Sequence, residues 1–154
     1  MITLDYTATA SDFIGPSPVS PAIVSFTLTF DNSADISETS AGLTINSANF
    51  AYAPTVVFSY IANADLIEIG ANSELNQGAA TDDFLIDIAA ASSNPSLDYF
   101  AISSTTTAGI VFAASLSLTP NTVSEVPEPA SLALLGMALA GVGAMRGRRS
   151  RTSV

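Results

Sequence analysis

The stretch Val24-Ser-Phe-Thr-Leu-Thr-Phe30 is the clearest structural pattern in the sequence. Its apolar side chains occupy every second position, and serine or threonine fills the positions between them. Successive side chains of an extended chain point to opposite faces, so this alternation is typical of a half-buried β-strand. The aromatic and hydroxyl-bearing residue types also suit a pleated surface. We therefore predict a strand with one face on a core and the other in water.

Similar short runs recur on both sides of this stretch, about every ten residues. Gly, Pro, Asn, Asp and Ser fill the segments between them, and no run has the spacing of an amphipathic helix. Eight or nine short strands of this kind predict an all-β domain, an antiparallel β-sandwich with Greek-key or jelly-roll-like connections. The other predicted strands lie at residues 2–9, 43–46, 50–52, 56–61, 66–69, 84–88, 99–103 and 110–118.

Charge is divided unevenly along the chain, whose formal net charge is −10. All 14 carboxylates precede the four arginines, and the chain has no lysine or histidine. A body this acidic repels phosphates, so we expect no binding to nucleic acid. The lack of Cys, His and Lys removes thiolate, imidazole and Schiff-base chemistry. The remaining catalytic possibility is a pair of carboxylates, and we expect no enzyme activity.

Two acidic clusters are candidate sites. Asp31, Asp35 and Glu38 lie in a predicted turn region (residues 31–40), where oxygen ligands could hold calcium, the one possible cofactor. The cluster lacks the alternating pattern of an EF-hand loop, and we favour a solvated turn in which the aspartates cap backbone amides.

The second cluster is formed by Asp82, Asp83 and Asp87. A glycosidase would pair one of these carboxylates with Glu68 or Glu74 across a cleft. Nothing in the sequence indicates a groove, and we favour solvated residues at strand ends. Four aromatic residues could instead offer faces for sugar stacking, although in strands such side chains are more often in the core or in cross-strand pairs, and we favour the core. These residues are Tyr52, Tyr60, Tyr99 and Phe100.

The end of the chain has three successive parts: Val126-Pro-Glu-Pro, an apolar segment over residues 130–145, and an arginine cluster. Sixteen helical residues span about 24 Å, somewhat less than the roughly 30 Å of a bilayer core. Arginine side chains can reach the headgroups and mark the cytoplasmic side, so we predict a transmembrane helix with the preceding domain outside. From these residues alone, the helix is either a single-span anchor or part of a processed sorting signal. The residues concerned are Ala130, Leu132, Leu134, Leu135, Gly136, Leu139, Gly141 and Met145 in the span, then Arg146, Arg148, Arg149 and Arg151.

This tripartite tail closely resembles the PEP-CTERM sorting signal of Gram-negative bacteria that make extracellular polysaccharide. The matching residues are Val126-Pro127-Glu128-Pro129-Ala130-Ser131, the run from Leu132 to Gly141, and the terminal arginines. The resemblance implies recognition by exosortase, a membrane-embedded cysteine transpeptidase, at the Pro-Glu-Pro motif. It also implies an inner-membrane precursor that is processed and passed to the cell surface or the extracellular matrix.

The predicted organisation is a β-domain over residues 1–119, a linker over 120–126 and a sorting signal over 127–151. The first residues, Met1-Ile-Thr-Leu-Asp, have neither the basic nor the apolar region of a secretion signal, so we expect either that the true start lies further upstream or that the gene is truncated. We predict a non-catalytic surface or matrix protein. The alternative is a calcium- or carbohydrate-binding module associated with exopolysaccharide.

Overall fold

The computed structural model describes residues 1–71, 81–106 and 109–121, and the ordered elements in these ranges are β-strands. The strands are β1 (Ile2–Ile14), β2 (Ala22–Phe30), β3 (Ile36–Thr39), β4 (Leu43–Ala48), β5 (Val56–Ile61), β6 (Leu66–Ala71), β7 (Asp83–Ala89), β8 (Ser96–Ser103) and β9 (Ile110–Pro120).

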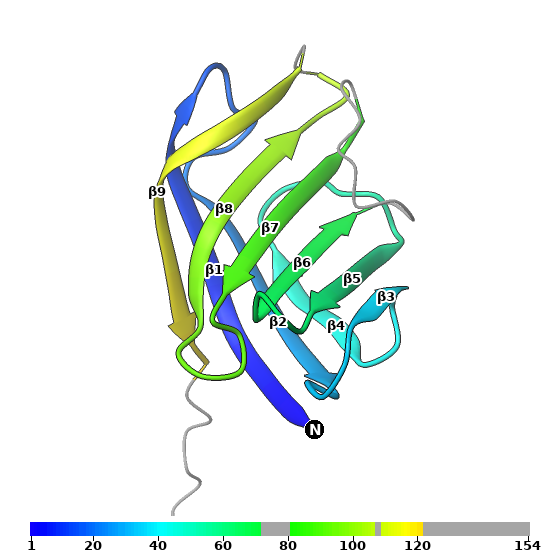
Figure 1. Cartoon of the computed structure of the whole chain (residues 1–154). Helices are drawn as coiled ribbons and strands as arrows, with labels where there is room; N and C mark the ends of the chain where they lie inside the picture. Colours follow the sequence, from blue (N-terminus) through cyan, green and yellow to red (C-terminus); the bar gives the residue numbers. More distant parts are fainter. Residues whose placement is uncertain (72–80, 107–108, 122–154) are drawn as a thin grey trace, which may run out of the picture. The chain divides into compact units, whose positions relative to one another are not determined.

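All nine strands belong to one antiparallel sheet, in the order β3-β5-β6-β7-β8-β9-β1-β2-β4 (Figure 1). Strands β5 to β9 follow one another as a meander. The last of them, β9, then pairs with the N-terminal strand, in a register that joins Tyr6 to Pro120 and Ile14 to Phe112. Hydrogen bonding therefore continues without a break from one edge of the sheet to the other.

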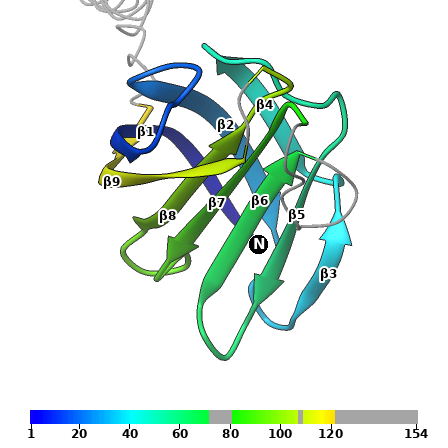
Figure 2. The ribbon, with the colours of Figure 1, turned by 90° about the horizontal axis from the view of Figure 1, so that it is seen from above.

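The sheet curls until its two edges approach each other, giving a half-barrel (Figure 2). Only residues 40–42 join edge strand β3 to edge strand β4. Such a connection spans at most about 15 Å. Gly42 in this connection has a φ of +93° and packs closely on β2, where a Cβ atom would lie 2.2 Å from the carbonyl oxygen of Thr29. The Thr29 N–H also donates to the Gly42 carbonyl at 2.9 Å.

The core fills the inside of this curl. Strand β2 alternates buried and half-buried residues along its whole length, which confirms the pattern seen in the sequence. Phe30 of β2 packs on Tyr60 of β5, with ring centroids 4.9 Å apart, and on Phe58 at 6.5 Å. The two halves of one sheet thus bury their inner faces against each other.

The prediction of an antiparallel all-β domain is confirmed, but the predicted two-sheet sandwich is wrong. Strand β9 pairs with β8 on one side and with β1 on the other, so the sheet bends and does not divide into two sheets. Side chains alternate inward and outward in both architectures, which is why the sequence pattern did not separate them.

The predicted transmembrane helix lies outside the described residues. Within the described ranges, no helix has the length and apolar character needed to cross a membrane. The predicted domain boundaries stay a prediction.

Candidate functional site

A row of side chains on the outer face of the sheet places two carboxylates, Glu68 and Asp87, beside Tyr99. Strand register places Ser59 of β5 opposite Glu68 of β6, Glu68 opposite Asp87 of β7, and Asp87 opposite Tyr99 of β8. Side chains directly opposite one another on one face have Cβ atoms about 5 Å apart. The Ser59 hydroxyl donates to Glu68 Oε2 at 3.0 Å and holds that carboxylate in place.

The same row continues into exposed apolar side chains. The ring centroid of Phe112 on β9 lies 5.9 Å from that of Tyr99, at an interplanar angle of 58°. Phe112 is in turn the register partner of Ile14 at the end of β1. We call the set Ser59, Glu68, Asp87, Tyr99, Phe112 and Ile14 the outer row.

Asp87 is the most perturbed carboxyl of the outer row. Burial, followed by the nearby negative charges of Glu68 and Asp98, raises the pKa of Asp87 from 3.8 to about 6. Its Oδ1 atom is buried and has no hydrogen-bond partner. Burial and the charge of Asp87 also raise the pKa of Tyr99. The acidic end of the row is thus a site of unrelieved negative charge.

The first predicted cluster serves the loops in which it lies. Asp31 Oδ1 accepts the Ser33 N–H at 3.0 Å, and this hydrogen bond lowers the pKa of Asp31. Asp35 Oδ1 accepts the Ala62 N–H at 2.8 Å. Glu38 lies exposed on β3. In the part of the chain that the structure describes, no three acidic side chains come together as metal ligands would.

The second predicted cluster is divided between two places. Asp82 Oδ1 accepts the N–H of Thr105 at 2.9 Å and its hydroxyl at 3.2 Å, and Asp83 Oδ1 accepts the Phe84 N–H at 2.8 Å. Asp87 instead faces Glu68. The structure therefore brings together one pair weighed for glycoside hydrolysis, on the outer face. Glu74 lies outside the described residues.

Three of the four candidate stacking aromatics contribute to the core. Tyr60 and Phe100 are buried. Tyr52 is half-buried, with its ring centroid 5.7 Å from that of Phe84. Only Tyr99 among them stands on the outer face, so the expectation of core positions is wrong for this residue.

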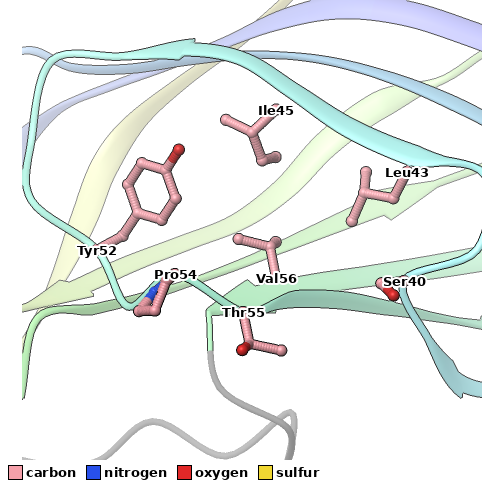
Figure 3. A pocket seen from close by; sticks show the side chains of 7 residues that line it. All are labelled: Ser40, Leu43, Ile45, Tyr52, Pro54, Thr55 and Val56. Carbon is pink, nitrogen blue, oxygen red and sulfur yellow. The ribbon is translucent and has the colours of Figure 1, made fainter.

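Two hollows lie elsewhere on the domain. One of about 410 Å³ opens between β4 and β5, where Leu43 and Ile45 face Val56 across the curl and Tyr52 closes one end (Figure 3). Another of about 360 Å³ lies among loops that include Phe50, and Asp82 is its one carboxylate. Among the described residues, no pair of carboxylates lines either hollow.

Asn121, the last residue that the structure describes, is held by hydrogen bonds to β1 and β2. Asn121 donates through its side-chain amide to Asp5 Oδ1 at 2.7 Å and to Ser25 Oγ at 3.0 Å. Its side-chain oxygen accepts the Thr7 hydroxyl at 2.6 Å, and its backbone N–H donates to the Asp5 carbonyl at 2.8 Å. The chain thus leaves the sheet from a position held on β1 and β2.

Immediately after this fixed position, residues 125–149 match the family model of the PEP-CTERM protein-sorting motif. The chain carries a PEP-CTERM sorting motif. This motif implies exosortase-dependent processing of a membrane-anchored precursor that is later exported. Nothing among curated proteins or solved structures matches the chain. The roles predicted for Val126 to Arg151 fall on residues outside the described ranges and stay predictions.

Sequence reasoning missed two parts of this picture. The run Ile110–Leu118 was predicted as a strand, but which of its apolar residues would face outward depends on the pairing of β9 with β8 and β1. Phe112 and Ile14 therefore gave no signal as a surface pair. Asn121 gave none either, because its partners lie more than 90 positions away in the chain.

Proposed function

We propose that this chain is a non-catalytic surface or extracellular-matrix protein that exosortase processes through its PEP-CTERM sorting motif. The observation that carries the proposal is the match of residues 125–149 to the sorting motif. Its position supports the idea, because the motif begins four positions after Asn121, which ties the end of the sheet to β1 and β2.

Each part of the tail has a role in this proposal. Pro127, Glu128 and Pro129 form an extended recognition element, since each proline removes a backbone donor and disfavours helix before it. The apolar residues 130–145 hold the precursor in the inner membrane. The arginines stay on the cytoplasmic side, which leaves the β-domain outside. Exosortase supplies the chemistry, and this chain is its substrate.

The domain itself acts by contact in this proposal. Of the described carboxylates, the pair nearest each other by register, Glu68 and Asp87, faces outward and lines neither hollow. A glycosidase needs its two carboxyl groups on either side of a bound sugar. An interaction role fits this placement better than hydrolysis does.

A second candidate function is a carbohydrate-binding module, and the outer-face pair of half-buried Tyr99 and exposed Phe112 favours it. Aromatic faces beside hydrogen-bonding side chains suit sugar rings. The calcium-binding alternative has less support, because Asp31 and Asp35 already accept backbone N–H groups.

The test is to replace Pro127, Glu128 and Pro129 together by alanine, in a host that contains exosortase and with a secretion signal ahead of Met1. We expect this variant to stay in the inner membrane while the unchanged protein reaches the surface or medium. Replacement of Thr122, Val123 and Ser124 together by alanine is the matched control, because it changes the same number of residues directly before the matched motif. Equal release of the triple variant would contradict the proposal.

A further inference from the structure

The apolar end of the outer row is a surface that nothing in the described chain covers. Phe112 is 43% exposed and Ile14 72% exposed, and apart from Met1 they are the large apolar side chains that the described residues leave exposed. They are register partners on β9 and β1, with Tyr99 beside them. Single exposed apolar residues are ordinary, but adjacent ones on a regular face indicate a binding surface.

The acidic end of the row indicates the charge of the partner. Glu68, Asp87 and Asp98 repel one another, and residues 1–145 contain no lysine, arginine or histidine that could neutralise them. Asp87 Oδ1 is buried without a hydrogen-bond partner. A cationic donor beside Glu68 and Asp87 would relieve this repulsion. An ammonium group beside Tyr99 would also be attracted to the face of the ring.

The position of the row in the sheet indicates what kind of polymer carries that charge. Strands β6, β7, β8 and β9 each have a neighbour on both sides, so their backbone groups are used in the ladders. An extended peptide adds to a free sheet edge, and none of these four strands is at an edge. Recognition must come from side chains alone, across about 14 Å from Glu68 to Phe112. Flat aromatic faces next to acceptors suit the apolar face and the polar groups of a sugar ring.

We propose that the outer row binds a linear polysaccharide that carries free amino groups, with sugar rings on Tyr99 and Phe112 and ammonium groups at Glu68 and Asp87. The inference deepens the interaction role proposed above and does not depend on the processing of the tail. Failure of sugar binding would leave the sorting proposal intact, and failure of processing would leave this one intact.

The test is isothermal titration calorimetry on the full chain, held in a detergent without a sugar headgroup, at about pH 6.5. A glucosamine hexasaccharide is the probe, and the fully N-acetylated hexasaccharide is its uncharged counterpart. We expect binding of the glucosamine probe only, and at least about tenfold weaker binding in Glu68→Gln with Asp87→Asn. Phe112→Ala should weaken binding about fivefold or more, with an unchanged circular dichroism spectrum.

The control double variant, Asp31→Asn with Asp35→Asn, removes the same net charge from exposed positions between β2 and β3 and should bind as the unchanged protein does. Equal losses in the two double variants, equal binding of the N-acetylated probe, or no binding at all would overturn the proposal. Equally tight binding of hexalysine would indicate that the ligand is a basic peptide and not a polysaccharide. A dimer that Phe112→Ala dissociates, seen by light scattering, would replace it by a second copy of this chain.

Discussion

Replacing Asp87 by asparagine should stabilise the protein at neutral pH and not at acid pH. Burial and the charges of Glu68 and Asp98 raise the folded-state pKa of Asp87 to about 6, against 3.8 for a free aspartate. The folded state therefore binds its proton more tightly than the unfolded state does, and stability falls as pH rises from about 4 to about 6. Tyr99, the remaining titratable neighbour, stays neutral throughout this range.

The size of the effect follows from the shift. About two pKa units correspond to at most about 3 kcal/mol. Because the side chain is half-exposed and solvent and salt screen the charges, we expect about 1 kcal/mol. For a domain of this size that is about 3–5 °C in Tm. The assay is urea unfolding followed by tyrosine fluorescence and circular dichroism at about pH 4 and pH 7.5, since the chain has four tyrosines and no tryptophan.

The change in unfolding free energy between the two pH values isolates the titration, because an unsatisfied amide costs the same at both. Asp31→Asn is the control, because hydrogen bonding to Ser33 lowers the folded-state pKa of this exposed aspartate, so the substitution should not stabilise the protein at the higher pH. An equal effect of Asp87→Asn at both pH values, or the same change in the control, would refute the reasoning.

Three further predictions test the parts of the fold that hold its edges and ends. Gly42→Ala should cost about 2–3 kcal/mol in urea unfolding, because the new Cβ would meet the Thr29 carbonyl oxygen. Gly109→Ala, with a similar φ and open space around it, should cost about 1 kcal/mol, and equal costs would contradict the close packing of Gly42 on β2. Asp65→Ala should cost about 2 kcal/mol, because its carboxylate accepts the backbone N–H and the hydroxyl of Ser92, both at 2.9 Å. Burial raises the pKa of Asp65, but hydrogen bonding outweighs burial and holds the folded-state pKa below 3.8. The stabilisation by the Asp65 carboxylate is therefore present above that pH and is lost on acidification below it. An unfolding curve that Asp65→Ala leaves unchanged at neutral pH would contradict this prediction. Asn121→Ala should cost about 1–2 kcal/mol in the same assay, because its side chain hydrogen-bonds to Asp5, Thr7 and Ser25. Processing of the sorting motif should be unchanged. Lost processing in a folded variant would show that the position of Asn121 contributes to recognition.

The strands were largely predictable because their residues alternate locally. Strand β2 has apolar residues at every second position and is buried at those positions in the structure. Prediction failed where pairing between distant segments decides the structure. Residues 11–14 were expected in a loop, yet they extend β1 because β9 offers partners as far as Phe112. Strand β3 lies in the serine-rich stretch expected to be a turn, and its pairing with β5 places it at the edge.

The candidate site was predictable only in part for the same reason. Glu68 and Asp87 are 19 positions apart in the chain, and the register of β6 on β7 makes them neighbours. Tyr99 and Phe112 meet through the pairing of β8 with β9. The sorting motif, by contrast, is contiguous, so its residues identify it without any knowledge of the fold.

The most direct test of the account is the intact mass of the mature protein from cells with and without exosortase. The account predicts a species that ends near Pro129 when the enzyme is present, and unprocessed protein in the inner membrane when it is absent. Full-length protein in the membrane under both conditions would contradict it. The tail would then be an ordinary anchor, and the β-domain would act from the membrane surface.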